Sequence, residues 1–315
     1  MRIHVPSFDD KIDSNQQNAL RKERGQAPGP GSIMWDTFSD LSLAPFSTPI
    51  LVMQAAHPDV GAAVAQYSVY KKDPWGRLFR TGFSMMRFLY GGKQGRQSRA
   101  ESLDLRKLHA HIKGIRADGS AYHALNSRTF RVVPDTFLDG VIRFRETIGK
   151  PLDSEEKIKV FDEYINLCLL FGIPRTELEP NLDAFLRYYD NLLLRVMNYN
   201  ETVAFLLGEM MKYGPTIRYL PMPKRWWQAI YTRTLYPLIR VFTLGFLDPR
   251  FRQLHHIPWS DLDERLYRRN VRFVTIVRKI IPRCLRYSPL ALYIMLGGHG
   301  PNTMNYDRLK TMIKN

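Results

Sequence analysis

Cysteine is scarce in this chain of 315 residues, which contains only Cys168 and Cys284. Cys168 lies in the apolar run 167–171, where we expect a small buried side chain, so no disulfide framework is predicted. Long hydrophobic runs are also missing, since no stretch approaches the roughly 18 apolar residues that a membrane-spanning helix needs. The first ten residues lack the apolar core of a secretory signal. We therefore expect a cytoplasmic protein.

Several common catalytic signatures are absent from the sequence. It contains no phosphate-binding Gly-x-x-x-x-Gly-Lys, no Gly-x-Ser-x-Gly, no His-Glu-x-x-His and no pair of Cys-x-x-Cys motifs. Their absence argues against a nucleotide-dependent or a zinc enzyme. The composition, with 44% hydrophobic and 12% aromatic residues, is nevertheless that of a packed globular protein.

Acidic residues are few relative to basic ones, and the formal net charge is +16. Residues 214–289 hold fifteen basic and four acidic residues, a net charge of +11. Such a region could bind an anionic membrane or nucleic acid, with Arg265, Arg268, Arg269 and Arg272 as the candidates. Aromatic and aliphatic residues interleave with these charges at helical spacing, which favours the solvated outer face of packed helices. Cations that neutralise the carboxylates of a cofactor are a further interpretation.

Helical periodicity dominates the chain, and the predicted helices end at glycine or proline. We expect helices at 77–90, 101–116, 154–171 and 263–296, one that begins at Asp59, and one over 182–211 that is interrupted near 198–200. The only candidate strand is 129–133. The prediction is an all-α protein with one large helical domain over 33–300, of globin-like or bundle-like packing. A flexible N-terminal arm is expected at 1–32 and a C-terminal tail at 301–315.

Two of the eight histidines lie in the predicted helix 101–116. Its apolar residues recur at three- and four-residue spacing, and at about 100° per residue His109 and His111 fall on opposite flanks of that stripe. A neutral imidazole beside an apolar core suits an axial ligand of haem iron. Periodicity does not choose between the two histidines, and on this pattern alone a structural or surface role is the simpler interpretation.

A second cluster lies between Asp73 and Thr81. Arg77 and Thr81 are four residues apart, so on a helix they share a face and could present a cation and a hydroxyl to one cavity. Without other support, this pattern is that of an ordinary helix start with surface arginines.

Taken in order, these pieces resemble the catalytic-domain family shared by bacterial rubber oxygenase (latex clearing protein) and MpaB, the fungal mycophenolic-acid-pathway oxygenase. The resemblance covers roughly residues 32–290. The matching segments are Gln54-Ala-Ala-His57-Pro58, Asp73-Pro-x-x-Arg77-x-x-Arg80-Thr81, Leu108-His109-Ala-x-Ile-Lys-Gly114, Tyr122-x-Ala124, Pro151-Leu-x-x-Glu155 and Phe171-Gly-Ile-Pro174.

The resemblance implies an all-helical protein packed around a buried haem b. It favours His109 as the ligand of the iron and leaves His111 as the fallback ligand. In rubber-cleaving members an Arg-x-x-Lys-Thr element lines the opposite face of the haem, which here corresponds to Arg77, Arg80 and Thr81. A guanidinium offers no lone pair to iron, so Arg80 should not be an axial ligand. Arg77 and Arg80 would instead bind a ligand of the iron or the haem propionates.

Two departures from the family pattern concern the chemistry. No glutamate occurs between Met53 and Arg77, and residues 132–134 read Val-Val-Pro where many relatives have a Trp-Val-His-like stretch.

The first hypothesis is a haem b oxygenase that uses O2 on a small apolar substrate, including unsaturated ones, with Arg77, Arg80 and Thr81 as catalytic residues. The second is a haem carrier or sensor without oxygenase chemistry. The third is a basic helical module that binds anionic membrane or, with less support, nucleic acid. Peripheral membrane contact is compatible with the first hypothesis.

Overall fold

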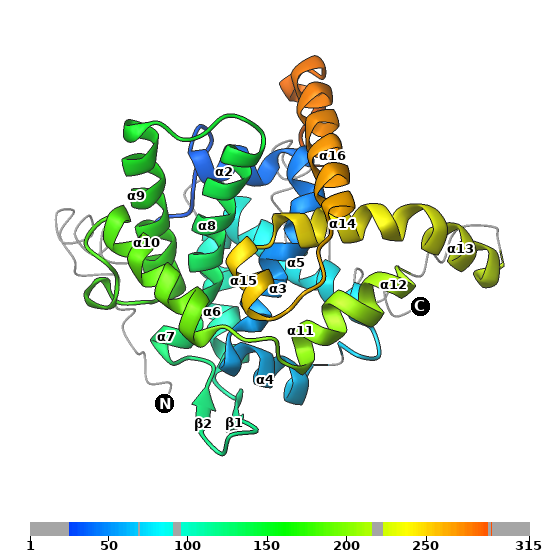
Figure 1. The fold of residues 1–315 in the computed structure, drawn as a ribbon. Coiled ribbons are helices and arrows are strands. Elements are labelled where there is room, and N and C mark those ends of the chain that lie inside the picture. The colour runs from blue at the N-terminus through cyan, green and yellow to red at the C-terminus, as the bar shows by residue number, and fades with distance from the viewer. Residues whose placement is uncertain (1–24, 69, 91–95, 216–222, 289–290, 292–315) are drawn as a thin grey trace, which may run out of the picture.

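A computed structural model describes residues 25–68, 70–90, 96–215, 223–288 and 291. Most of it is helical, which confirms the all-α prediction (Figure 1). In the first half these are α2 (Ile33–Ser39), the 3-10 helix η1 (Leu41–Leu43), α3 (Ala44–Ala56), α4 (Pro58–Tyr67), α5 (Pro74–Tyr90), α6 (Arg96–His109), α7 (Ser127–Phe130) and α8 (Val132–Thr147). In the second half they are α9 (Ser154–Phe171), η3 (Arg175–Glu177), α10 (Leu182–Asn191), η4 (Leu192–Val196), α11 (Glu201–Phe205), η5 (Leu206–Met210), α12 (Met211–Tyr213), α13 (Lys224–Ile230), η6 (Tyr231–Leu235), α14 (Tyr236–Phe246), α15 (Pro249–Leu254), α16 (Asp261–Ile280) and η7 (Arg283–Leu285).

Helix α3 lies at the centre of the molecule and contacts α4, α8, α11 and α14. It is apolar around its circumference, as expected of a helix that neighbours enclose on all sides, and Phe46, Val52 and Ala56 are fully buried. Close approach to α8 depends on Gly140, where an added Cβ would lie 2.7 Å from Cδ1 of Ile50. The core therefore forms around an early segment of the chain.

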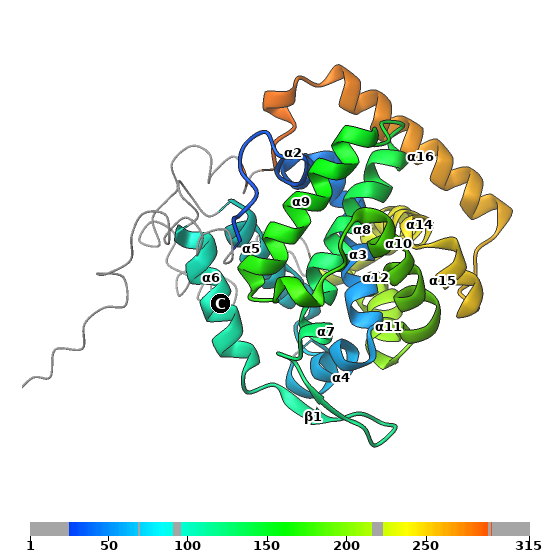
Figure 2. The same cartoon turned by 90° about the vertical axis from the view of Figure 1, so that its left-hand side faces the viewer.

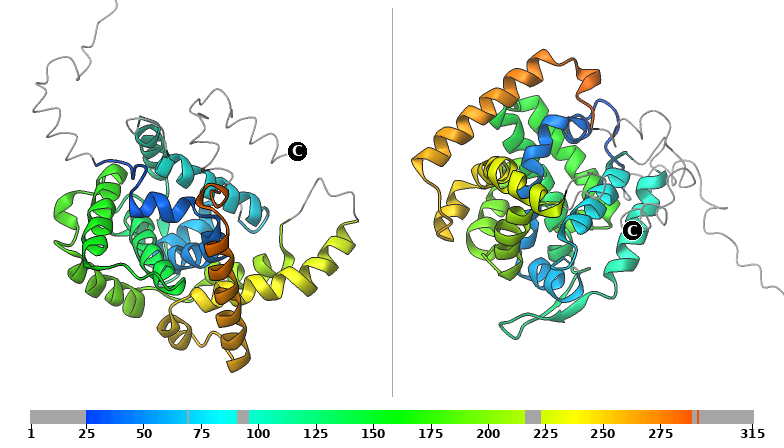
Figure 3. Two further views of the ribbon diagram at one scale, coloured as in Figure 1. Left: turned by 90° about the horizontal axis from the view of Figure 1, so that it is seen from above. Right: turned by 90° about the vertical axis from the view of Figure 1, so that its right-hand side faces the viewer.

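The other helices surround α3 in groups (Figures 2 and 3). Helices α8, α9 and α10 pack in sequence on one side, α5 and α6 pair on another, and α14 and α16 pack together on a third. Helix α2 is fixed to α9 because the two carboxylate oxygens of Glu163 accept hydrogen bonds of 2.8 Å from the first two backbone N–H groups of α2, those of Ile33 and Met34. A carboxylate at that position satisfies free donors and complements the helix dipole.

Three of the predicted helices appear nearly as expected. Helix α9 has the predicted bounds, with a capping box between Asp153 and Glu156 and a left-handed C-cap at Gly172. Helix α5 ends at Tyr90 as predicted and begins three residues earlier, at Pro74. The predicted interruption near 198–200 is present between η4 and α11. The helix expected from Asp59 begins one residue earlier, with Pro58 in its first turn.

The predicted helix over residues 101–116 has the wrong bounds at both ends. Helix α6 begins at Arg96 and ends at His109, and Lys113–Ile115 (β1) then pairs antiparallel with Ala121–His123 (β2). An added Cβ at Gly114 would lie 2.4 Å from Oε1 of Gln66, so glycine permits this close contact with α4. Leu108 and Ile115, assigned to a buried stripe by periodicity, are 62% and 65% exposed. The hairpin, which periodicity could not indicate, ends the helix.

Two further predictions of secondary structure are wrong. Residues 129–130 end α7 and residues 132–133 begin α8, so this segment is not extended; Asn126 caps α7 by accepting a hydrogen bond from Arg128 N. The local cap and tertiary burial thus override the β-branched composition of this segment. Helix α16 ends at Ile280 instead of continuing to Leu296, because Pro282 holds Ile281 extended.

The predicted terminal segments lie mostly outside the described residues. These include residues 1–24 of the predicted arm and the whole tail 301–315. Within 25–32, Gly25 and Pro28 are buried, and an added Cβ at Gly25 would meet the backbone oxygen of Asn166 in α9. In the described part of the chain, no helix combines the length and apolar character required to cross a membrane. Cys168 is buried and free, as predicted.

Candidate functional site

His109 is the last residue of α6, and its imidazole is fixed by its own helix. Its Nδ1 lies 2.7 Å from the backbone oxygen of Leu105, one turn earlier. A carbonyl oxygen only accepts hydrogen bonds, so Nδ1 carries the proton and Nε2 keeps its lone pair. Metal-binding histidines commonly show this arrangement, in which a second hydrogen bond sets the tautomer and ring orientation.

The surroundings of His109 favour the uncharged ring. Burial lowers the pKa of His109, the hydrogen bond to Leu105 opposes this effect, and the positive charge of Arg77 lowers the pKa further. The imidazole packs edge-on against Phe130, with ring centroids 5.4 Å apart. Phe130 in turn contacts Phe171, which contacts Phe88. Residues from α5, α6, α7 and α9 thus form a continuous aromatic support for this ring.

Arg77 and Thr81 share one face of α5, as predicted. Arg77 donates from NH1 to Oγ1 of Thr81 and from Nε to Oγ of Ser68, each over 2.7 Å. Both partners are neutral, and no carboxylate of the described residues lies within 4.0 Å of this guanidinium. Burial lowers the pKa of Arg77, and the neighbouring charge of Arg80 lowers it further. The group nevertheless stays protonated, because its ordinary pKa is far above neutral.

Arg80 is held differently, although it lies on the same helix. Its NH1 is 2.9 Å from Oδ2 of Asp73, and Oδ1 of Asp73 accepts from the backbone N of Gly76. The charge of Arg80 is therefore compensated by Asp73, the residue that precedes α5. The predicted catalytic and cofactor-binding roles of Arg80 stay predictions, and its geometry supports a positioning role better than direct contact with a ligand.

His111 and His109 differ in environment. His111 lies beyond the end of α6 and is exposed, so the idea that the two histidines flank one helical stripe equally is wrong. The fallback role of His111 as an iron ligand stays a prediction. Burial now favours His109 independently of the family resemblance.

Phe130 and Ser68 are candidate site residues that the sequence interpretation missed. Phe130 was assigned to a strand, although Asn126 followed by Ser127 is an N-cap signal that would have placed it in a helix. Ser68 directly follows α4, and only the fold brings its hydroxyl to Arg77. His57, at the junction of α3 and α4, is also buried, and its Nδ1 has no hydrogen-bond partner among the described residues.

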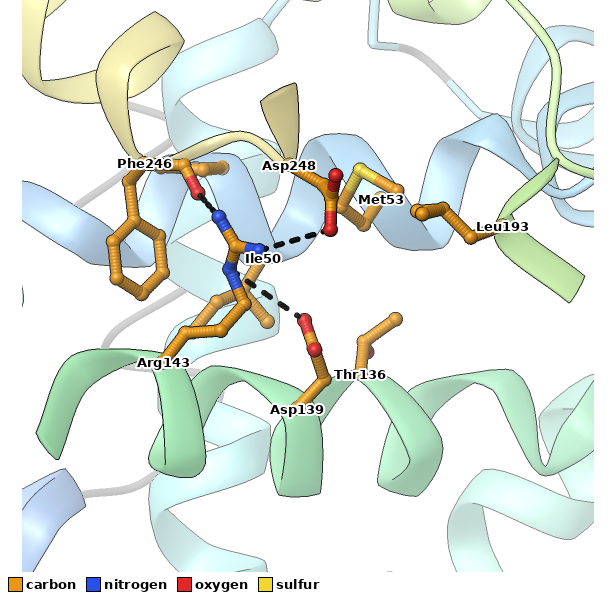
Figure 4. A pocket seen from close by; sticks show the side chains of 9 residues that line it. Ile50, Met53, Thr136, Asp139, Arg143, Leu193, Phe246 and Asp248 are labelled. Carbon is orange, nitrogen blue, oxygen red and sulfur yellow. Dashed lines mark hydrogen bonds and ion pairs between the residues drawn. The ribbon is translucent and has the colours of Figure 1, made fainter. Parts of the chain in front are cut away.

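Two cavities lie elsewhere in the described part of the molecule. A groove of about 860 Å³ runs between α6 and the end of α9. A smaller cavity of about 10 Å³ lies beside Arg143, whose NH1 is 3.1 Å from Oδ2 of Asp248 and whose NH2 donates to Phe246 O (Figure 4). The second is no larger than one water molecule, so it cannot hold a substrate. Neither cavity is lined by His109 or Arg77.

The donor set around His109 fits one kind of metal site better than others. Among the described residues, no group of three or more His, Cys, Asp or Glu side chains is placed to hold an ion. Haem iron can be held by a single protein side chain such as a histidine. A single partly buried, neutral imidazole with its Nδ1 already bonded meets that requirement.

Comparison with known families gives one match. The sequence model of the family described as ER-bound oxygenase mpaB/B′/rubber oxygenase, catalytic domain, matches residues 35–276. This span contains α5, α6, α7 and every site residue discussed above. No curated protein matches the chain, and no solved structure does.

Proposed function

The chain belongs to the family of mpaB-type and rubber oxygenase catalytic domains, and from this premise we propose that it is a haem b-dependent oxygenase acting on a small apolar molecule. His109 would be the protein ligand of the iron. O2 would be the co-substrate, and unsaturated compounds are included in the substrate class. The observation that carries the proposal is the partly buried imidazole of His109, bonded to Leu105 and within electrostatic reach of Arg77.

The uncompensated charge of Arg77 supports an anionic or polarised group beside His109. A partly buried guanidinium that donates only to hydroxyls lacks the carboxylate that normally offsets its desolvation. A haem propionate or the oxygen of a bound ligand would supply the missing partner through charge-assisted hydrogen bonds. Arg77 itself cannot bind iron, because its nitrogens have no available lone pair.

Thr81 is placed to complete the polar part of the site. Its oxygen accepts from Arg77, so its own hydrogen is left to donate to another group. Bound haem would supply the activation of O2. The protein would set the orientation of the imidazole through Leu105 and Phe130 and provide two directed donors, Arg77 and Thr81.

One observation favours the second candidate, a haem carrier or sensor without oxygenase activity. No carboxylate of the described residues lies within 4.0 Å of Arg77, and Asp73 is already paired with Arg80. A general base for substrate deprotonation is therefore missing from the immediate neighbours of Arg77. O2 uptake that depends on an added unsaturated apolar substrate would rule against this candidate.

The proposal is tested by the absorption spectrum of the purified protein after haem supplementation, with a pyridine haemochrome assay for haem b. We expect a Soret band in the wild type, its loss or large shift in His109→Ala, and an unchanged band in His111→Ala as the matched control. A wild-type protein without a Soret band contradicts the proposal. So does a His109→Ala variant whose band is unchanged.

A further inference from the structure

Helix α16 has two apolar faces, and only one of them is used in packing. Tyr267, Val271 and Val274 pack against the core. A second stripe points to solvent, with Leu262, Phe273, Ile276 and Ile280 exposed by 57%, 67%, 55% and 73%. At about 100° per residue these four side chains fall within one sector of the helix, in which the exposed Arg269 lies between Leu262 and Phe273. Isolated exposed apolar residues are ordinary, but a cluster such as Phe273, Ile276 and Ile280 marks an interaction site.

A row of cations runs along one edge of this stripe. Arg265, Arg272 and Lys279 are spaced seven residues apart, so they lie above one another on the helix surface. All three are exposed, and none has a carboxylate of the described residues within 4.0 Å. Arg268, by contrast, is paired with Glu264. The three cations are therefore available to an external anionic partner.

The orientation of α16 is fixed by contacts on its packed side. Arg240 NH1 lies 2.6 Å from Oδ1 of Asp263 near the start of the helix. Near its end, Nε of Arg278 is 2.9 Å from Oδ2 of Asp40. These pairs prevent the helix from rotating to bury its outer stripe. Helix α16 accordingly lies along the outer edge of the molecule (Figures 1 and 2).

We propose that this face of α16, defined by Leu262, Phe273, Ile276 and Ile280 with Arg265, Arg272 and Lys279, binds an anionic membrane surface. An interfacial helix inserts its apolar side chains between lipid headgroups while its basic residues contact the anionic ones. This inference goes beyond the proposed function and does not depend on haem.

Charge distribution selects the membrane over two other partners. A second copy of the chain related by two-fold symmetry would present this same face of α16. Unpaired cations of both copies would then meet at the interface and repel each other. Nucleic acid would use the cations but leave the apolar stripe in water. Only an anionic lipid surface satisfies both rows of side chains.

The test is co-sedimentation of the full-length protein with vesicles of pure phosphatidylcholine and with vesicles of phosphatidylcholine and phosphatidylserine in equal amounts. We expect binding to the anionic vesicles that weakens as sodium chloride is raised. The triple variant Arg265→Gln, Arg272→Gln, Lys279→Gln should bind about a hundredfold more weakly, at roughly 1 kcal/mol per cation. Phe273→Ser with Ile280→Ser should also weaken binding about tenfold or more.

The matched control removes three exposed cations from α9, α10 and η4, as Lys157→Gln, Arg187→Gln and Arg195→Gln, and should bind vesicles nearly as the wild type does. Circular dichroism establishes that each variant is folded. The proposal is overturned by equal loss in the control, by no binding to anionic vesicles at low salt, or by equal binding to neutral ones. Duplex DNA binding without vesicle binding, or dimers abolished by Phe273→Ser, would overturn it too.

Discussion

Arg131 and Arg77 are arginines of neighbouring regions, one at the start of α8 and one in α5, and their partners differ. Arg131 is almost fully buried and pairs with Asp135 and Glu179. Tyr164 and Tyr188 donate to the carboxylate of Asp135 over 2.6 and 3.1 Å. The guanidinium of Arg131 also stacks over the ring of Tyr188. Every charge in this cluster has a partner, as expected of a structural network.

Arg77 has only neutral hydroxyl partners, although it lies beside the aromatic support of His109. The two regions meet in the sequence at Phe130 and Arg131, where one side chain contacts His109 and the next anchors the Asp135 network. The network around Arg131, in which every charge has a partner of opposite charge or a hydrogen-bond donor, holds the junction of α7 and α8 rigid. The nearby charge of Arg77 has no anionic partner and is available to a ligand.

The largest expected effect comes from breaking the compensated network. Asp135→Asn removes the principal anion beside Arg131 and should lower the free energy of unfolding by about 3 kcal/mol, because it leaves buried positive charge only partly paired. Urea denaturation measures the change. Asp183→Asn, which neutralises an exposed carboxylate on α10, is the control and should change stability by less than about 0.5 kcal/mol. Similar effects of both variants would contradict the structural role of the Asp135 network.

The second prediction applies the converse change to the uncompensated arginine. Arg77→Met replaces a cation that has no anionic partner, so the stability of the apoprotein should change by no more than about 1 kcal/mol, in either direction. Haem affinity should fall about tenfold to a hundredfold, since hydrogen bonds to charged groups contribute about 1.5–3 kcal/mol. Titration of apoprotein with haem gives the affinity, and Arg128→Met, at an exposed position, is the control. Strong destabilisation with unchanged haem affinity would show that Arg77 has a structural role, as Arg131 does, and does not bind the haem.

The third prediction is the pH dependence of haem binding. Burial and Arg77 lower the pKa of His109 below its usual 6.5, so as the pH falls the unfolded chain takes up this proton before the folded one. The contribution of neutral His109 to folding is therefore lost below pH 6.5, while the imidazole stays available to iron until the pH reaches its lowered pKa. The Soret band should stay constant from neutral pH through 6.5 and be lost only as the pH falls through the lowered pKa of His109.

Arg77→Met should move this transition to higher pH, because it removes one of the causes that lower the pKa of His109. A spectrophotometric pH titration of both proteins measures the shift. An identical midpoint in the two proteins would show that Arg77 does not act on the His109 ring.

The smallest effect is expected at the contact between the two regions. Phe130→Leu keeps an apolar side chain and removes only part of its volume, so it should cost about 1 kcal/mol of stability. It removes the edge-on aromatic contact that orients His109, and the Fe–His stretching band in resonance Raman spectra should broaden or shift. Phe161→Leu, elsewhere in the aromatic core, should have a similar cost in stability without any spectral change. A spectral change in both variants would indicate a general loosening of the core.

Local sequence signals predicted several elements well. Asp153 with Glu156, followed later by Gly172, specified both ends of α9, because caps and left-handed glycines act within a few residues. The four-residue spacing of Arg77 and Thr81 predicted their shared face correctly. The family resemblance added His109 to this pair; the match over residues 35–276 confirms the family, and the role of His109 stays a proposal.

Long-range contacts explain where the sequence interpretation failed. Hydrophobic periodicity predicted a helix that continues to Arg116. In the structure α6 ends at His109, β1 pairs with β2 after it, and His111 is exposed. Ser68 and Phe130 reach the site from α4 and α7, and no spacing rule relates residues so far apart. The pairing of Arg80 with Asp73 was likewise not evident from residue types alone.

By itself the sequence determined the helical class, the best-capped helix ends and the face shared by Arg77 and Thr81, because these depend on neighbours within one or two turns. Only the tertiary structure decided which of His109 and His111 is shielded from solvent, which of Arg77 and Arg80 lacks an anionic partner and which stripe of α16 faces solvent. Those properties depend on desolvation and charge pairing between segments far apart in the chain, and both are set only when the helices pack.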